Sequence, residues 1–140
     1  MSETKINVAI VGASGYSGEE LVRRGAWARC VQIIGAFDAA LALTVTHTSQ
    51  RVQFGRTLSR FQAVQHALAT MAGEIEQARA ATELATAAVG EHGFTGDRAE
   101  YAVTVAKVAV GRAVTPVTTI AHQLHGAIGV TTEHPLWSVT

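Results

Sequence analysis

Residues 59–89 read SRFQAVQHALATMAGEIEQARAATELATAAV, and this stretch decides the fold. Its seam residues recur at alternating intervals of four and three, at Val64, Leu68, Met71, Ile75, Ala78, Thr82 and Ala85. Such spacing keeps these side chains on one face of an α-helix, as in the seam of an antiparallel bundle. The abundant Ala also favours a helix, because Ala loses no side-chain entropy when a helix forms. We therefore predict a helix over roughly residues 59–89.

A helix is also predicted on each side of this stretch. The helix over roughly residues 24–50 carries a stripe of Trp27, Val31, Ile34, Asp38, Leu41, Val45 and Thr48, widened by Cys30 and Phe37. The helix over roughly residues 98–125 keeps the rhythm with Val103, Ala106, Val110, Ala113, Val117, Ile120 and Leu124. Gly55 and the glycine-rich residues 90–97 interrupt the pattern, and short loops of this kind connect antiparallel neighbours. The predicted fold is therefore all-α, an up-and-down helical bundle.

Two residues depart from these helical patterns. Asp38 stands on the stripe of the first helix, so we expect it either to have a buried partner or to lie at the edge of the stripe. Pro116 stands inside the third helix, where a proline removes one backbone hydrogen bond and clashes with the preceding turn. We therefore expect a kink near Thr115.

The composition of the 140 residues limits the possible classes of protein. Hydrophobic residues make up 48% and charged residues 16%, which indicates one folded domain and not a disordered chain. The 11 basic and 11 acidic side chains cancel, so we expect no binding to nucleic acid or to an anionic membrane. No uninterrupted apolar run reaches the roughly 20 residues of a membrane span. Cys30 is the only cysteine, which excludes an intrachain disulfide and fits the cytoplasm, the location that we expect.

The first 24 residues follow a different pattern. Residues 6–11 predict a short buried strand, and Gly12, Gly15 and Gly18 follow it at the spacing of a dinucleotide-binding loop. Residues 5–24 resemble the opening of N-acetyl-γ-glutamyl-phosphate reductase, an NADP-dependent enzyme. In dinucleotide-binding proteins a parallel sheet of several strands holds such a loop, but we predict no further strand after Arg24. We therefore expect residues 1–24 to be a reductase-like segment and residues 25–140 to form the bundle.

The sequence around Gly55 combines charged, amide and aromatic side chains. They are Arg51, Gln53, Phe54, Arg56, Arg60, Phe61 and Gln62. Arginine binds phosphates in a forked geometry, amides donate hydrogen bonds, and the aromatic rings offer flat apolar surface. From the residues alone, the alternative is a polar turn between helices whose arginines are solvated.

The order of the residues in this block favours phosphate binding over a solvated turn. Residues 51–66 closely resemble the R-x-x-F-G-x-x-x-x-x-(F/H)-Q signature of the acyl-CoA dehydrogenases. In that family the block holds the pyrophosphate and adenosine of the FAD bound to a neighbouring subunit. The resemblance implies the same contacts here for Arg51, Gln53, Phe54, Phe61 and Gln62.

A second segment near the end of the chain resembles the same family. Residues 121–136, AHQLHGAIGVTTEHPL, are similar to its Q-x-x-G-G-x-G-x-x-x-E-x-P segment, with Ala127 in place of the commoner second glycine. The resemblance implies that the adenine and ribose side of the flavin is lined by Gln123, Leu124, His125 and Gly126.

The histidines of this segment allow a second interpretation. The spacing of His122 and His125 fits a metal pair, but only Glu133 or His134 offers a third ligand nearby. The family resemblance explains these positions without a metal ion, so we predict no metal site. The histidines with no partner pattern in the sequence are His47, His66 and His92.

Over residues 26–140 the resemblance implies the FAD-binding and oligomerising domain of an acyl-CoA dehydrogenase. Such flavoproteins oxidise the α,β-carbons of an acyl-CoA thioester in fatty acid metabolism. The resemblance implies a homo-oligomer, a dimer or tetramer, or association with a partner dehydrogenase subunit. The alternatives are a fragment of an NADP-dependent semialdehyde-type reductase and a non-enzymatic helical interaction module.

The resemblance assigns no catalytic residue to this chain. In many members the catalytic carboxylate lies beyond the position of Thr140, and Glu133 matches a structural position of the motif. We therefore expect a bundle that is truncated at its end and is incomplete as an enzyme on its own.

Overall fold

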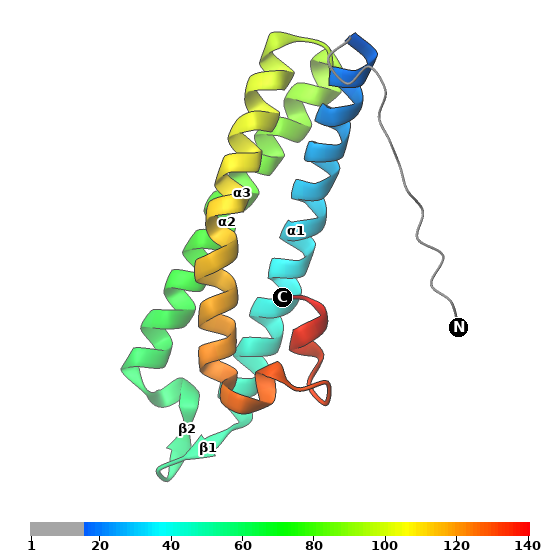
Figure 1. The fold of residues 1–140 in the computed structure, drawn as a ribbon. Coiled ribbons are helices and arrows are strands. Elements are labelled where there is room, and N and C mark those ends of the chain that lie inside the picture. Colours follow the sequence, from blue (N-terminus) through cyan, green and yellow to red (C-terminus); the bar gives the residue numbers. More distant parts are fainter. Residues whose placement is uncertain (1–15) are drawn as a thin grey trace, which may run out of the picture.

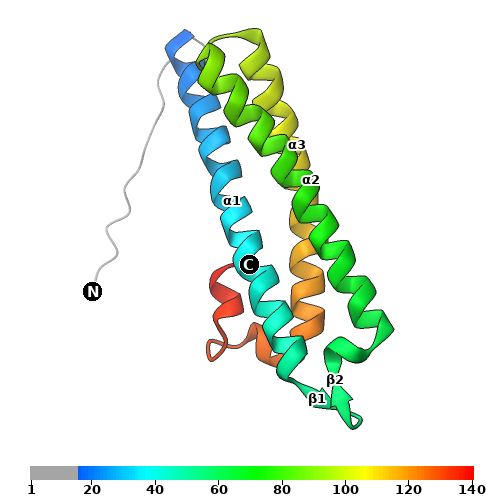
Figure 2. The ribbon, with the colours of Figure 1, turned by 180° about the vertical axis from the view of Figure 1, so that it is seen from behind.

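Three long helices dominate the computed structural model, which describes residues 16–140. They are α1 (Tyr16–Gln50), α2 (Gln62–His92) and α3 (Asp97–His125). Figures 1 and 2 show the helices side by side and running in alternating directions. The C-terminal ends of α1 and α3 therefore lie at the same end of the bundle as the start of α2 (Figure 1). The prediction of an all-α, up-and-down bundle is confirmed.

Short elements connect and follow the helices. A two-stranded hairpin of β1 (Val52–Gln53) and β2 (Arg56–Thr57), followed by η1 (Leu58–Arg60), links α1 to α2. After α3, η2 (Gly126–Val130) and η3 (Pro135–Ser138) fold back along the bundle (Figure 1). The hairpin and η2 thus occupy the same end of the molecule.

The start of α2 differs from the prediction near Ser59. The Leu58 amide donates a hydrogen bond to the Arg51 carbonyl at 2.9 Å, which closes the hairpin. Phe61 then has an extended backbone, with φ −89° and ψ 130°, and α2 begins only at Gln62. Strands of two residues are too short to show an alternating pattern in the sequence.

α1 begins at Tyr16 and not near Arg24 as predicted. The intervening residues continue into α1 as one helix, and Glu19 pairs with Arg23 at 3.3 Å, four positions on. Gly18 is consequently a buried helical residue and not part of a loop. The predicted strand over residues 6–11, together with Gly12 and Gly15, lies outside the described residues.

The core lies along the seams where the three helices meet. The predicted seam of α2 is confirmed from Met71 to Ala85, which are both fully buried. The predicted seam of α3 is confirmed for Val103, Ala106, Val110, Ala113 and Val117.

The buried stripe of α1 differs from the predicted one. Val31 and Val45 are each 44% exposed, whereas the stripe that faces the core is Cys30, Ile34, Phe37, Ala40, Thr44 and Thr48. The two buried threonines satisfy their hydroxyls locally, because Thr44 donates to the Ala40 carbonyl at 2.6 Å and Thr48 to the Thr44 carbonyl at 2.9 Å. A hydroxyl that is bonded in this way can be buried with little penalty.

Polar contacts tie α1 to its neighbours at the edge of the core. Asp38 lies at the edge of the stripe and forms an ion pair with Arg79 of α2. Nearer the start of α1, the Trp27 indole donates to the Thr86 hydroxyl at 3.0 Å. Arg23 donates to the Phe94 carbonyl at 3.0 Å and pairs with Glu100 at 2.7 Å. Of the two alternatives for Asp38, the edge position is therefore correct.

α3 continues through Pro116 without ending. Its ring removes one donor from the helix. Two residues further on, the Thr118 hydroxyl donates to the Val114 carbonyl at 2.8 Å. The kink near Thr115 stays a prediction.

By length and composition alone, two segments are apolar enough to cross a bilayer. They are residues 18–50, with a mean hydropathy of 1.5 in the most apolar stretch, and residues 97–130, with 1.2. Core helices of soluble proteins have the same composition. In this bundle both segments contribute to the shared core, for example through Phe37 and Val110.

The chain after α3 is fixed by close packing around Gly129. Leu136 is fully buried, and a Cβ added to Gly129 would lie 2.7 Å from the Cβ of His125 and 3.2 Å from Leu136 Cδ2. His125 is itself buried, so it has little room to move away. Gly129 therefore allows η2 to approach the end of α3.

We predict that Gly129→Ala lowers the free energy of unfolding by about 1–3 kcal/mol, because the added methyl group overpacks this contact. Urea denaturation followed by helical circular dichroism measures the change. Gly35→Ala is the matched control, since among the described residues nothing lies within 4 Å of its added Cβ. In the middle of α1 that change should stabilise the protein by up to about 1 kcal/mol. Equal effects of the two substitutions would contradict the packing at Gly129.

Candidate functional site

One pocket joins the end of α1 to the end of α3. It has a volume of about 230 Å³ and is lined by His47, Arg51, His125, Ala127 and Ile128. The first two residues lie in and just after the last turn of α1, and the other three lie at the end of α3 and in η2. The alternating helix directions bring these distant segments together (Figure 1).

Arg51 lies at the junction between α1 and the hairpin. Its amide donates to the His47 carbonyl at 2.8 Å, which continues the helical hydrogen bonding beyond Gln50. With its amide oxygen turned toward the guanidinium, Gln53 accepts hydrogen bonds from Arg51 at 2.9 and 3.3 Å. The exposed guanidinium is therefore oriented by the hairpin and keeps donors available for an anionic ligand.

The hairpin presents an aromatic edge to solvent. Its two central residues, Phe54 and Gly55, both have positive φ, of 53° and 78°. Positive φ is disfavoured for a residue with a bulky side chain, and the Phe54 ring is 91% exposed. This ring packs edge-on against Phe61 at 6.3 Å, and the Arg56 guanidinium stacks on Phe61 at 4.1 Å.

His125 is the buried polar side chain of the pocket, with 6% of its surface exposed. Its Nδ1 lies 2.8 Å from the Ala121 carbonyl, so the neutral ring carries its proton on Nδ1 and donates it there. Nε2 is left as an acceptor, and it has no hydrogen-bond partner among residues 16–140. A buried polar atom without a partner marks a place where a ligand or water is expected.

Burial keeps the histidines of the pocket neutral. It lowers the pKa of His47 below its ordinary range, and His125, His134 and Arg51 lower it further. Burial also lowers the pKa of His125, and His134 and His122 lower it further, against the opposing effect of the Ala121 and Leu43 carbonyls near its ring. Both imidazoles therefore offer lone pairs at neutral pH.

Of the nine residues predicted to contact FAD, Arg51 and His125 line the same pocket. Gln53 lies beside Arg51, and Phe54 and Phe61 form the aromatic edge of the hairpin. The others lie around the same end of the bundle: Gln62 is the first residue of α2, Gln123 is exposed, Leu124 is half-buried, and Gly126 caps α3 with a φ of 66°.

The prediction from sequence missed three residues of the pocket: His47, Ala127 and Ile128. One signal for His47 was available, because it precedes Arg51 by four positions and a helix places such residues on one face. Ala127 and Ile128 lie within a motif that the sequence had already indicated.

The sequence of the bundle matches a known protein family and its members. The sequence profile described as "Acyl-CoA dehydrogenase, C-terminal domain" matches residues 19–139. The chain is 38% identical over 107 residues to the probable acyl-CoA dehydrogenase FadE2 of Mycobacterium tuberculosis, which covers 76% of this chain and 26% of that protein.

Solved structures show the same arrangement of helices. The butyryl-CoA dehydrogenase of Megasphaera elsdenii superposes with a TM-score of 0.77 at 30% identity, covering 90% of this chain and 32% of that chain. A chain of the ChsE4–ChsE5 complex from Mycobacterium tuberculosis superposes with a TM-score of 0.81 at 26% identity, covering 87% and 32%. The chain thus spans 26% to 32% of the length of these relatives.

The strained and exposed Phe54 gives a prediction about stability. Asn–Gly is a preferred pair for a two-residue turn with positive φ at both positions, so Phe54→Asn should relieve strain and lose no buried contact. We expect the free energy of unfolding to rise by about 1 kcal/mol. Urea denaturation of the variant measures this change.

The matched control is Val52→Asn, on the same hairpin and also exposed. A surface substitution of this kind should change stability by no more than about 0.5 kcal/mol. A clear loss of stability in Phe54→Asn would show that the contact of the ring with Phe61 stabilises the hairpin more than the positive φ strains it.

Proposed function

The chain belongs to the acyl-CoA dehydrogenase family, whose C-terminal domain matches residues 19–139, and we propose that the bundle binds the nucleotide half of FAD for a dehydrogenase. Acyl-CoA dehydrogenases are FAD-dependent flavoproteins. One observation carries the proposal: Arg51 and His125, far apart in the sequence, line a single pocket.

The hydrogen-bonding groups of the pocket, donors from Arg51 and an acceptor from His125, fit a pyrophosphate and its ribose. The exposed guanidinium of Arg51 supplies paired N–H donors of the kind that bind phosphate oxygens. The partnerless Nε2 of His125 accepts a hydrogen bond, which suits a ribose hydroxyl. At Gly126 no described atom lies within 4 Å of an added Cβ, so a ligand can approach the backbone.

The remaining predicted contacts lie at the same end of the bundle as this pocket. The exposed ring of Phe54 and the neighbouring ring of Phe61 offer flat surface to the adenine. Gln53 holds Arg51, while Gln62 and Gln123 offer exposed amide groups at the same end of the bundle. In the family such contacts reach the FAD of a neighbouring subunit, and we propose the same arrangement here.

The dehydrogenation itself is proposed for a whole protein, because this chain spans only 26% to 32% of the length of its relatives. FAD accepts a hydride in the α,β-dehydrogenation of an acyl-CoA thioester, the substrate that we propose. That reaction also needs a carboxylate base near the α-carbon. No carboxylate lines the described pocket, and Glu133 is exposed. We therefore assign no catalytic residue here.

The NADP alternative has less support. It depends on residues 5–24, and in the part of that segment that the structure describes, from residue 16 onward, Gly18 lies inside α1 and not in a loop. The family match begins at residue 19 and gives no support to a reductase. The reductase resemblance of the first residues stays a prediction. We propose a cytoplasmic location, which the single cysteine of the chain fits.

We expect Arg51→Ala to weaken FAD binding by about 10- to 100-fold, because hydrogen bonds to a charged group contribute about 1.5–3 kcal/mol. Quenching of flavin fluorescence on titration of the protein measures the affinity. Arg29→Ala is the matched control, since Arg29 is an exposed arginine on α1 that does not line the pocket. Affinity that falls equally in both variants, or in neither, would contradict the proposed role of Arg51.

A second surface supports self-association. A groove of about 370 Å³ lies between α2 and the first half of α3, and its lining includes Tyr101, Val105 and Val108. Tyr101 is 73% exposed and Val108 is 57% exposed. Exposed apolar side chains that cluster in this way mark interfaces between proteins. We propose that the bundle forms a homo-oligomer, a dimer or tetramer, or pairs with a partner dehydrogenase subunit.

Val108→Asp should shift the chain toward the monomer, because burying a carboxylate in the interface costs desolvation free energy and opposes association. Sedimentation velocity at several protein concentrations measures the change. Val31→Asp, at an exposed valine on α1, is the control and should leave the oligomer unchanged. A wild-type chain that is monomeric at all concentrations would contradict self-association, whereas an oligomer that binds no FAD would favour the helical interaction module.

A further inference from the structure

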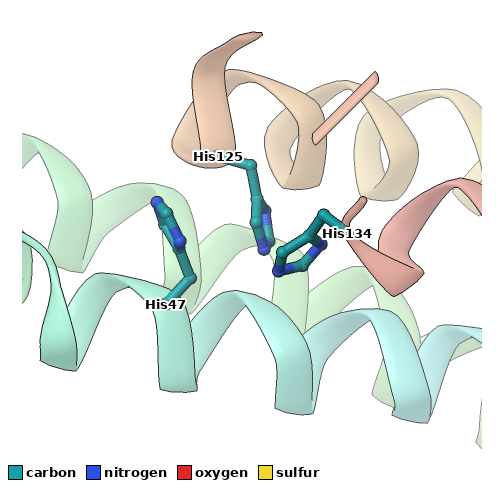
Figure 3. A group of neighbouring side chains, drawn as sticks. All are labelled: His47, His125 and His134. Carbon is teal, nitrogen blue, oxygen red and sulfur yellow. The ribbon is translucent and has the colours of Figure 1, made fainter. Parts of the chain in front are cut away.

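Three histidines from three different segments meet beside the pocket. They are His47 of α1, His125 at the end of α3 and His134 immediately before η3. Figure 3 shows their rings gathered between α1 and the end of α3. One ring nitrogen from each lies within 4.8 Å of the others. The His125 ring centroid is 4.5 Å from that of His47 and 4.6 Å from that of His134.

The hydrogen bonding of His125 is that of a metal ligand. Metal-binding histidines donate the N–H of one ring nitrogen to a carbonyl or carboxylate, which orients the ring and leaves the other nitrogen for the metal ion. His125 directs Nδ1 to the Ala121 carbonyl at 2.8 Å, and its buried Nε2 has no partner within the described part of the chain. Because the side chain is only 6% exposed, solvent has little access to that nitrogen.

The surroundings suit a cation. α1 and α3 each have one histidine of this cluster in the last turn, and the carbonyls at a helix C-terminus carry partial negative charge. Arg51 is the opposing positive charge, and it is exposed.

We propose that His47, His125 and His134 form a binding site for a divalent transition-metal ion, with Zn²⁺ as the best fit. Imidazole nitrogen is a preferred ligand of Zn²⁺, and three histidines with one open position make a common coordination set. The adjoining pocket leaves space for water in the fourth position. This site goes beyond the proposed nucleotide binding, because it uses His134 and does not use Arg51. The two proposals share Nε2 of His125, so Zn²⁺ and a ribose hydroxyl compete for that one lone pair.

Metal binding requires the rings of the cluster to turn, because the His47 and His125 rings are stacked with 26° between their planes and imidazole lone pairs lie in the ring plane. Zn–N bonds of about 2.0–2.1 Å place tetrahedral ligand atoms roughly 3.4 Å apart, so the rings must close inward from the present separation. His47 and His134 are half-buried and have room to turn. The Nδ1 of His134 now accepts a 3.2 Å hydrogen bond from the Leu136 amide, and this bond is lost whichever ring nitrogen binds the metal ion.

The test uses the full chain without a histidine tag, stripped of metal by a chelator. Zn²⁺ is titrated by calorimetry, and Co²⁺ is titrated as a coloured substitute whose visible absorption reports tetrahedral coordination. One equivalent of each ion should bind. Loss of a residue that only supports a metal ligand weakens metal binding by about 10- to 100-fold. His47→Gln and His134→Gln each remove a ligand, so each should weaken Zn²⁺ binding by at least that much. His66→Gln, at an exposed histidine outside the cluster, should have no effect.

The proposal is overturned if the wild-type chain shows no saturable binding, or if the cluster variants bind Zn²⁺ as tightly as His66→Gln. If a cluster variant unfolds, imidazole NMR of the wild type decides: Zn²⁺ must shift the ring resonances of His47, His125 and His134 but not that of His66. Two further measurements separate this site from the nucleotide site. Arg51→Ala should keep Zn²⁺ while it loses FAD affinity, and His134→Gln should lose Zn²⁺ while it keeps FAD affinity.

Discussion

The packing of α3 against α1 and α2 is the constraint on which the rest of the structure depends. Small side chains such as Ala106 and Ala113 alternate with Val103 and Val110 along the buried face of α3, which allows the helices to approach closely. The same face continues to His125, the last residue of the helix. A shift of this face by one residue would turn His125 by about 100° away from α1. The register of the core therefore sets the geometry of the pocket.

The parts of the fold that the sequence predicted are those with a long repeated pattern. The seams of α2 and α3 repeat over several turns, so an error at one position does not shift the rest. In α1, Val45 and Thr44 are neighbours, and hydrophobicity favours burying the valine, yet the threonine is the buried one. Its hydroxyl bonds within the helix, which lowers the cost of burying it. Only the contacts between helices decide such a choice, and they are not local in the sequence.

The candidate site also has one part that the sequence predicted and one part that it did not. Arg51 and Gly126 belong to compact motifs that can be read locally, so their place at one end of the bundle followed from the helix order. The histidine cluster has no local pattern, because His47, His125 and His134 come from three elements that meet only after folding. The pocket consequently combines two chemistries. Arg51 offers charge to an anion at the exposed rim, while neutral imidazoles offer lone pairs in the interior.

The central claim is that the segments around Arg51 and Gly126 form one nucleotide site. Two-dimensional ¹H–¹⁵N NMR of the labelled chain, titrated with ADP as the nucleotide half of FAD, tests it most directly. Amide resonances of residues 51–55 and 125–128 should shift together, with a single dissociation constant for both segments. Shifts confined to one segment, or different dissociation constants for the two, would contradict a shared site.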